Sequence, residues 1–509
     1  MNSSHAQASD TPDMKLFWCC FVALITTSFG FIVRAFSIGD WGQEFGLSAT
    51  QQGEIFGVGL WPFAISIIIF SLIIDKIGYK TALWFAFACH VVSVFLTVRA
   101  NGYWSLYWAT FIVALGNGTV EAVVNPVVAT MFKTNKSKWL NILHAGWPGG
   151  LALAGLLFIG LGDTSWQLKV WLILVPAIAY GLMMIPVKFP INERVAAGVS
   201  YKEMLAEMGA LGVLIVSYLV YQEIGRVFAF SGALTWGLII ATTVLFWAYV
   251  RSLGRPLFVI LLLIMIPLAI TELATDGWVT ELMGPEMKNI GLHSGWVIVY
   301  TSVIMVVLRF NAGPVVGFFS PLGLLAVCSA LAALGLYWLS AAHAGIAILA
   351  AATLYGIAKS YFWPTILGVV SERFPKGGAL TLNATGGLGM LSAGVIGAVF
   401  LGLSQDRAID KNVAAHDMMN GTAIHETYLT VEKKSVLGAY NALDQEKVAA
   451  QATPEEQAVI TAATESSKKS ALKTVVILPI IMLISFVLLI LYFRSQGGYR
   501  PVSLGGGAH

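Results

Sequence analysis

A glutamate stands in the middle of a long apolar segment of this sequence. Glu121 lies in Gly118-Thr-Val-Glu-Ala-Val-Val-Asn-Pro126, and Asn117 and Asn125 are each one helical turn away from it. On a helix the three polar side chains share one face. Burial disfavours the charged form of a carboxylic acid, so this group could take up a proton near neutral pH. The pattern indicates proton exchange at a buried polar stripe; a glutamate locked in an ion pair is the structural alternative.

A lysine occupies the matching place in a second apolar segment. Lys359 stands five residues before Pro364, just as Glu121 stands five residues before Pro126. Ionisable groups inside apolar segments are expensive and commonly mark substrate or ion pathways. We expect Lys359 to pair with Glu121 across a cavity or with Glu272. Either contact could switch during function, and a fixed structural pair is the alternative.

Other polar residues interrupt apolar segments as well. Glu272 and Asp276 are four residues apart and share a helix face, with Asp276 closer to the surface. Arg34 could reach the membrane interface or bind an anionic group. His144 shares a face with Asn141 and is a candidate for a cavity.

The elements that position these residues follow from composition. Of 509 residues, 57% are hydrophobic and 11% are charged, whereas soluble proteins are about 25% charged. So few charges cannot cover a water-facing surface, so we predict an all-α polytopic membrane protein. The net charge of +3 does not indicate a nucleic-acid partner. We find no nucleotide-binding loop, enzyme constellation or metal-ligand spacing, and expect no enzyme, cofactor, metal or disulfide.

Fourteen segments are long enough to span a bilayer, since about 20 mainly apolar residues are needed. They are 16–36, 55–74, 82–99, 104–131, 139–162, 168–190, 208–228, 233–251, 256–280, 294–318, 322–342, 344–370, 379–404 and 474–493. With the amino terminus inside, short inner segments carry fifteen Lys and Arg and short outer loops carry four. This asymmetry predicts a plasma (inner) membrane protein with both termini in the cytoplasm.

The chain contains an internal repeat. The segments around Glu121 and Lys359 are each followed by a basic loop and a glycine-rich helix that opens with Leu-Asn, at Asn141 and at Asn383. Two halves in the same orientation fit parallel repeats. We therefore predict a six-helix half in 1–190, a loop and an added helix pair in 191–252, and a second six-helix half in 253–509.

A polar segment at 405–472 interrupts the second half. Thr453-Pro454 begins a helix, with threonine as the cap and proline at the first position. The stretch 432–450 also favours a helix. We predict an external helical hairpin that caps the outer mouth, with a flexible tether as the alternative.

The loop after the second helix resembles the signature of the major facilitator superfamily. It reads Ser71-Leu-Ile-Ile-Asp75-Lys76-Ile-Gly78-Tyr-Lys80, in which Asp75, Gly78 and Lys80 match and Ser71 replaces the usual glycine. The resemblance implies alternating access between two halves, with Asp75, Lys76, Gly78 and Lys80 in gating. Asp75 could accept hydrogen bonds from a helix N-terminus or pair with an arginine. A second inner-end residue, Arg309, resembles the structural arginine of that superfamily.

The fourth helix resembles that of the fucose–proton symporter group. Its Gly-x-Gly-x-x-Glu-x-x-x-Asn-Pro pattern contains Glu121, and Asn141 on the fifth helix also fits. The resemblance implies a role for Glu121 in substrate and proton handling. Two departures weaken the transfer of sugar specificity: the group's first-helix aspartate falls at Ala35, beside Arg34, and a sugar-binding asparagine is replaced by Trp147.

These observations predict a secondary active transporter of a small, sugar-like polar solute, coupled to protons. We expect a monomer in the lipid bilayer whose partners are the small-molecule substrate and protons. An organic-anion or drug exchanger is the first alternative, since Arg34 and Lys359 could meet a carboxylate. A non-transporting receptor derived from a transporter is the second.

Overall fold

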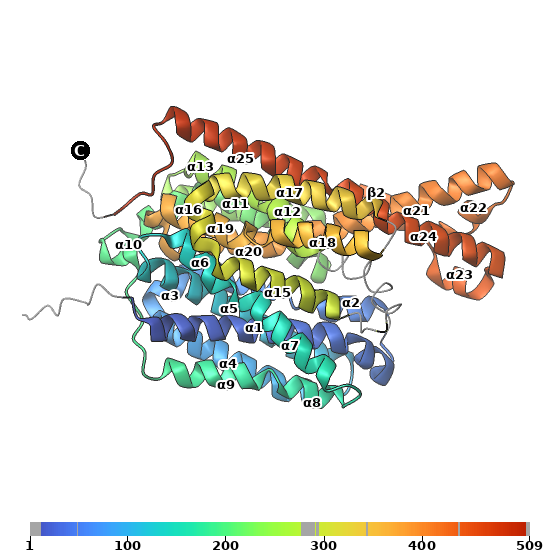
Figure 1. Ribbon diagram of the computed structural model, residues 1–509, viewed down its shortest axis with the longest axis horizontal. Helices are drawn as coiled ribbons and strands as arrows, with labels where there is room; N and C mark the ends of the chain where they lie inside the picture. The colour runs from blue at the N-terminus through green and yellow to red at the C-terminus, as the bar shows by residue number, and fades with distance from the viewer. Residues whose placement is uncertain are drawn as a thin grey trace, which may run out of the picture.

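The computed structural model is a bundle of long helices that run in both directions along one axis (Figure 1). It describes residues 12–47, 49–275, 291, 295–342, 345–435 and 438–504. Within these ranges thirteen helices are long and apolar enough to cross a membrane, and a fourteenth span results if a pair bent by 66° counts as one. The prediction of an all-α, multi-pass membrane protein with about fourteen spans is confirmed.

The first six spans are built from nine helices, because the second, fifth and sixth spans are each broken in two. Pro62, Pro148 and Pro176 lie within the first three residues of the second helix of each broken pair. A proline has no N–H to donate to the preceding turn, so it favours a new helix start. The nine helices are α1 (Met14–Phe45), α2 (Ala49–Gly57), α3 (Trp61–Ile77), α4 (Tyr79–Val98), α5 (Tyr103–Met131), α6 (Lys136–His144), α7 (Gly146–Gly160), α8 (Trp166–Trp171) and α9 (Leu174–Met184).

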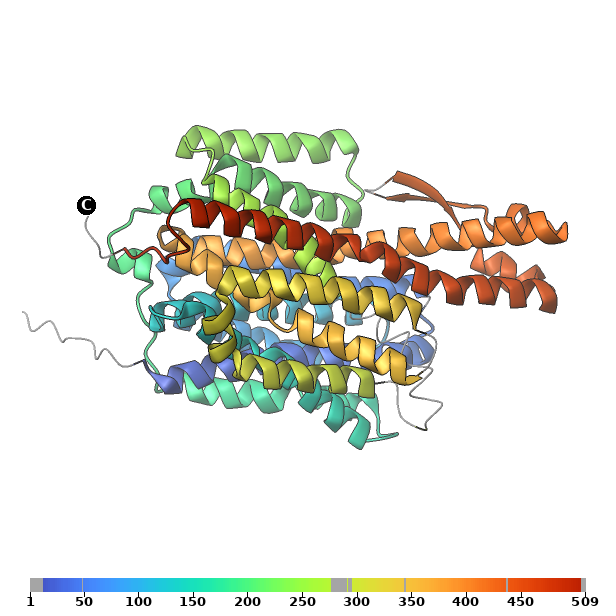
Figure 2. The same cartoon turned by 45° about the horizontal axis from the view of Figure 1, so that its top comes forward.

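Two long helices lie between the two halves along the sequence. The linker holds α10 (Glu193–Ala196), α11 (Tyr201–Val227) and α12 (Gly232–Val250). Helix α11 contacts α20 and α13 of the second half, whereas only 17% of the apolar window of α12 is buried. Helix α12 lies at the edge of the bundle (Figure 2). The added pair thus packs at the edge of the bundle, with α11 in contact with both halves and α12 on the outside of α11.

The second half repeats the pattern of broken spans. The elements are α13 (Pro256–Ala269), η1 (Ile270–Ala274), α15 (Trp296–Phe310), α16 (Ala312–Phe319), α17 (Pro321–Ala341), α18 (Gly345–Lys359), α19 (Phe362–Arg373), η2 (Pro375–Gly377), α20 (Gly378–Leu391), η3 (Ser392–Gly397) and α25 (Ile477–Ser495). Both η1 and η3 are π-helices, an irregularity that is frequent at functional sites. Asp276 lies outside the described residues.

The start of α1 and the end of α25 lie at the same end of the bundle (Figure 1). This arrangement follows from an even number of spans. We call this the inner end and the opposite one the outer end.

The polar insert projects from the outer end (Figures 1 and 2). It consists of α21 (Ala398–Asn420), α22 (Ile424–Tyr428), β1 (Val431–Ser435), β2 (Gly438–Ala442), α23 (Gln445–Gln451) and α24 (Pro454–Val475). Its own apolar core includes Val413, Tyr428 and Ile460, so it is a folded unit rather than a tether.

Two predictions for the insert have different outcomes. The helix start at Thr453 is confirmed, with a capping box between Thr453 and Glu456. The helix expected over 432–450 is wrong in its first part, where β1 and β2 form an antiparallel pair. Gly438 and Asn441 have low helix propensity, which leaves a hairpin as the alternative. The insert also extends away from the bundle and does not fold back over the outer mouth.

Candidate functional site

Prolines in the spans leave backbone carbonyls without their usual helical partner. A proline at position i cannot donate to the carbonyl of residue i−4, and in a membrane that oxygen needs another donor. Pro126 in this way releases the carbonyl of Ala122, and the Asn383 side chain of the second half donates to it at 3.1 Å. This bond fastens α20 to α5 across the seam between the halves.

Arg309 of α15 donates hydrogen bonds to two more carbonyls that prolines leave without a helical donor. Pro148 releases the carbonyl of His144 and Pro364 releases that of Ser360. The guanidinium donates from Nη1 to His144 O at 2.7 Å and from Nε to Ser360 O at 2.6 Å. His144 belongs to the first half and Ser360 to the second. One buried side chain, 2% exposed, therefore joins the two halves at the middle of the bundle.

The third contact of Arg309 is an ion pair. Its Nη2 donates to Glu272 Oε1 at 2.9 Å, and the other Glu272 oxygen accepts from the Trp363 N–H at 2.9 Å. Glu272 is thus a fully engaged carboxylate at the junction of η1 and α19. The sequence predicts a structural arginine at the inner end of its helix, but it does not indicate that Arg309 joins the two halves. Its signal was the same as that of Glu121, a charge inside an apolar span.

Glu121 has a very different environment. Its Oε2 accepts from Asn125 Nδ2 at 2.6 Å, and Asn125 Oδ1 meets His144 Nε2 at 2.8 Å. An amide oxygen only accepts, so the imidazole Nε2 carries the hydrogen in this arrangement. All three side chains are buried. A continuous hydrogen-bonded chain therefore runs from Glu121 through Asn125 to His144, whose own carbonyl is held by Arg309.

The remaining residues of the predicted stripe point elsewhere. Asn117 Oδ1 pairs with His90 Nε2 at 2.9 Å, and His90 in turn contacts the Tyr180 hydroxyl at 3.0 Å, all inside the first half. Asn141 Nδ2 donates to Thr365 Oγ1 of α19 at 3.1 Å and so crosses the seam.

Lys359 is buried at the end of α18, with its Nζ 5.6 Å from the centre of the Tyr355 ring. Lys359 and Glu121 form no hydrogen bond or ion pair with each other, and the Glu121 carboxylate is bonded to Asn125. The repeat thus places Glu121 and Lys359 in equivalent positions with different partners. Glu272, which the sequence offered as a partner for Lys359, is bound to Arg309 instead.

The two remaining candidates lie on the outer side of this cluster. Trp147 follows His144 in the chain, is partly buried and has its ring 5.9 Å from that of Phe31. Arg34 is buried, only 4% exposed, one turn after Phe31 on α1. Arg34 is therefore buried inside the bundle and does not reach the membrane interface.

At the inner end the signature loop binds the linker. Asp75 forms an ion pair with Arg194 of α10, which is the arginine alternative of the two that the sequence left open. Gly78 has φ 84°, the left-handed region that favours glycine, where α3 turns into α4.

The two lysines of this loop make complementary contacts. Lys80 Nζ donates to the carbonyl of Ile185 at 2.8 Å, and Lys76 Nζ lies 5.5 Å from the Tyr201 ring centre. The loop therefore fastens the second and third spans to the chain that leaves the first half.

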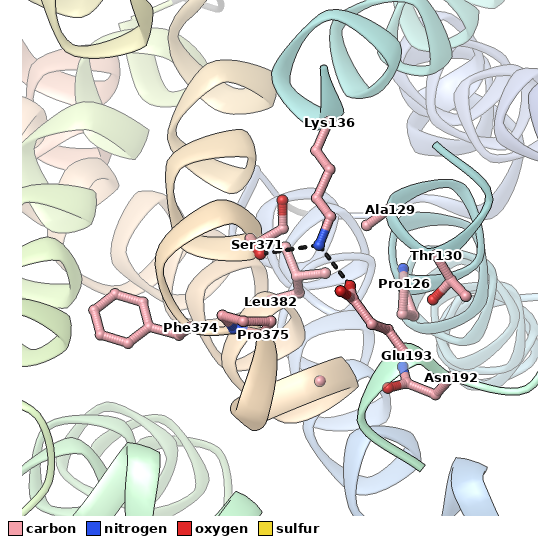
Figure 3. A pocket seen from close by; sticks show the side chains of 11 residues that line it. Pro126, Ala129, Thr130, Lys136, Asn192, Glu193, Ser371, Phe374, Pro375 and Leu382 are labelled. Carbon is pink, nitrogen blue, oxygen red and sulfur yellow. Dashed lines mark hydrogen bonds and ion pairs between the residues drawn. The ribbon is translucent and has the colours of Figure 1, made fainter. Parts of the chain in front are cut away.

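A small pocket at the inner end lies between the halves (Figure 3). Lys136 reaches into it from α6 and donates to Glu193 Oε2 at 2.6 Å and to the Ser371 carbonyl at 3.3 Å. Ser137, at the start of the same helix, donates from its hydroxyl to Glu372 Oε1 at 2.7 Å. These bonds hold the first half against α19.

The end of the chain binds the same glutamate. The Tyr499 hydroxyl donates to Glu372 Oε2 at 2.7 Å, and the Val502 N–H donates to the Glu372 carbonyl at 2.8 Å. Burial raises the pKa of the Tyr499 phenol, and the neighbouring carboxylate raises it further, so this hydroxyl stays a donor. Glu372 is therefore a shared anchor of the inner end.

Comparison with known proteins agrees with this architecture. The family description of the Major Facilitator Superfamily matches residues 18–398, so the chain belongs to that superfamily. It is a transporter by family and fold, not an enzyme. No curated protein sequence matches the chain.

Several solved structures share the fold. The proton:xylose symporter XylE bound to 6-bromo-6-deoxy-D-glucose has a TM-score of 0.57 at 13% identity, with 93% of this chain and 95% of that chain covered. The human organic anion transporter MFSD10 has a TM-score of 0.58 at 10% identity, covering 94% and 100%. A variant of the E. coli fucose:proton symporter FucP has 0.52 at 14% identity, covering 92% and 98%. At these identities the likeness concerns the fold.

Proposed function

We propose that this protein is a proton-coupled secondary transporter of a small polar, sugar-like solute that works by alternating access. The observation that carries the proposal is the hydrogen-bonded chain from Glu121 to His144, which ends where Arg309 joins the two halves. A proton site is thereby connected to the contact that must change when the halves rock against each other. The named activities of FucP and XylE, both proton symporters, are consistent with this assignment.

Glu121 is the carboxylate suited to carry the proton. Among the described residues its side chain has one hydrogen-bond partner, the neutral amide of Asn125. A buried carboxylate without a closely paired cation is destabilised by several kcal/mol, and protonation removes that penalty. The nearby cation, Arg309, already binds Glu272. Proton uptake by Glu121 therefore neutralises a carboxylate in the middle of the seam that forms no ion pair with the described residues.

The protonation state of Glu121 can reach the seam through Asn125. A carboxylate accepts the amide hydrogen of Asn125, whereas a carboxylic acid also offers a hydrogen of its own. When Glu121 is protonated, the Asn125 side-chain amide can rotate by 180°, so that His144 no longer faces the amide oxygen. Because the backbone of His144 binds Arg309, this change acts on the bond that joins the halves. Lys359, Asn141 and Trp147 are candidates for contact with the solute.

We also place both termini in the cytoplasm of a cell with this protein in its plasma membrane. The inner end then carries the closed contacts of Lys136 and Ser137, so the structure is closed toward the cytoplasm. A topology reporter fused at residue 440 should read outside and one fused at residue 196 inside. Two inside readings would reverse this orientation.

Flux into proteoliposomes tests the proposal. A thermal-shift screen of sugars, nucleosides and organic acids first selects a ligand for labelling. An inward proton gradient should then drive its accumulation, and addition of the solute should alkalinise the outside medium. Exchange that does not respond to the gradient would favour an antiporter instead, and binding without flux would favour a receptor.

A further inference from the structure

The outer half of α1 carries a row of buried donors. Arg34, Ser37 and Trp41 follow at i, i+3 and i+7 and therefore share one face of the helix. Their side chains are 4%, 0% and 2% exposed. Arg34 Nε and Nη1, Ser37 Oγ and Trp41 Nε1 make no hydrogen bond in the described part of the chain. Buried polar atoms are nearly always satisfied, so a row of this kind calls for an acceptor from outside the protein.

The guanidinium of Arg34 lies at a break in the second span. Residues 58–60 form a turn between α2 and α3, and the guanidinium occupies the space that a Cβ on Gly59 would fill. The rings of Phe56 and Phe31 flank its Cζ at 5.4 and 5.8 Å. Any residue other than glycine at position 59 would displace the Arg34 guanidinium from the break in the second span.

Irregular segments of the second half meet the same break. Gly394 of η3 lies against the side chain of Leu60, and Gly397 of η3 lies against Ile270 of η1. Non-helical backbone at membrane depth occurs where it is enclosed by protein or lines a cavity, and broken helices of transporters form their binding sites. The π-helix η3 therefore meets the break beside Arg34, and η1 packs behind η3.

The acid closest in sequence to Arg34, Asp40, is exposed and forms no ion pair with the described residues, and the next two are engaged elsewhere. Glu54 accepts from the Tyr103 hydroxyl at 2.6 Å, and Glu44 accepts from the indole N–H of Trp166. Among the described residues no carboxylate forms an ion pair with Arg34. A buried arginine fork without a counterion is matched best by an oxyanion, which it can hold through two parallel N–H groups.

We propose that Arg34, Ser37 and Trp41 form an anion site for the transported solute, which is therefore a small hydroxycarboxylate rather than a neutral sugar. The carboxylate binds the Arg34 fork at the break of the second span, and further oxygens accept from Ser37 Oγ and Trp41 Nε1. Trp147, in contact with Phe31, links this site to the central cluster. The assignment of the anion to a solute rests on the transport function proposed above.

Equilibrium binding to purified protein in neutral detergent tests the site without a proton gradient. Three pairs of probes differ in a carboxylate: lactate and propane-1,2-diol, gluconate and sorbitol, glucuronate and glucose. The melting temperature is followed against concentration for the wild type, Arg34→Gln, Arg34→Lys and Gly59→Ala. Arg99→Gln, which changes an arginine near the outer end, is the matched control.

In at least one pair the carboxylate should bind about tenfold or more tightly than its neutral partner, as expected for a charge-assisted contact. Arg34→Gln should remove this preference and Gly59→Ala should weaken it, because the added methyl displaces the guanidinium. Arg99→Gln should keep it. If Arg34→Gln does not fold, Arg34→Lys keeps the charge but not the fork and should show a reduced preference.

Equal binding within all three pairs, or a preference that survives in Arg34→Gln and Gly59→Ala, would overturn the site. A lipid headgroup is the other source of an oxyanion. Stabilisation by phosphatidylglycerol that depends on Arg34, without any effect of the soluble carboxylates, would overturn the assignment to a solute. If the carboxylates bind but a proton gradient does not drive accumulation, the anion site stands and only the proposed proton coupling is rejected.

Discussion

Two glutamates in the middle of the seam, Glu272 and Glu121, have the same side chain and opposite surroundings. Glu272 receives a guanidinium N–H and a backbone N–H, at 2.9 Å each. Glu121 receives a neutral amide at 2.6 Å. Environments that separate two carboxylates in this way assign them different roles. We propose that Glu272 is a fixed charge that orders Arg309 and that Glu121 is the group that gains and loses a proton.

The largest expected effect comes from neutralising the fixed charge. Glu272→Gln removes the carboxylate that pairs with Arg309 among the described residues, and breaking one side of a buried pair is destabilising by about 3–5 kcal/mol. At a pH where Glu121 is protonated, Glu121→Gln resembles the acid and should change stability by less than about 0.5 kcal/mol, because it removes neither a charge nor an ion pair. Melting temperatures of the two variants measure this contrast. Equal losses would mean that Glu121 is also a fixed charge.

A third buried glutamate, Glu372, sharpens the comparison at the inner end. Ser137→Ala removes the hydroxyl bond to Glu372 and keeps the one from the Ser137 N–H at 3.2 Å. The loss of about 1 kcal/mol should make inner opening about fivefold more frequent. The labelling rate of a cysteine placed at Ala129, which lines the pocket of Figure 3, reports this opening. Ser495→Ala, at the end of α25, is the matched control. An unchanged rate in Ser137→Ala would show that the hydroxyl contact with Glu372 does not hold the halves together.

The smallest effect is expected at Lys359. If this lysine acted on Glu121, Lys359→Met would disfavour the carboxylate and move the pH optimum of transport upward. Because Glu121 is bonded to Asn125 and Lys359 lies against the Tyr355 ring, we expect the pH optimum to stay in place while the rate of transport falls. The pH profile of uptake by the variant decides between the two. An upward shift would restore the pairing of Glu121 and Lys359 that the repeat suggested.

The sequence predicted the spans and the buried charges well, because both depend on local composition. Apolar runs of about 20 residues reveal helices, and a charge within one is visible without a structure. The prolines were visible too, but not their consequence. Pro148 and Pro364 release carbonyls that meet only when two distant helices bring them to Arg309. His144 and Arg309 are 165 positions apart, and no periodicity records such a contact.

Where local signals were balanced, prediction failed or left choices open. The segment 432–442 has both helix-favouring residues and a glycine that permits a hairpin, and β1 and β2 form there. For Asp75, a helix N-terminus and an arginine were equally compatible with the sequence. Because α10 lies beside the loop, Asp75 pairs with Arg194. The position of α10 depends on how the linker folds back on the first half.

Accumulation of the solute by Glu121→Gln in proteoliposomes tests the central claim most directly. The variant is compared with the wild type and with Glu223→Gln, which alters a buried glutamate of α11 that pairs with Arg226 away from the seam. We predict that Glu121→Gln still exchanges solute across the membrane but no longer accumulates it when a proton gradient is applied, whereas Glu223→Gln does both. Wild-type accumulation by Glu121→Gln would contradict the account and place the coupling proton on another group.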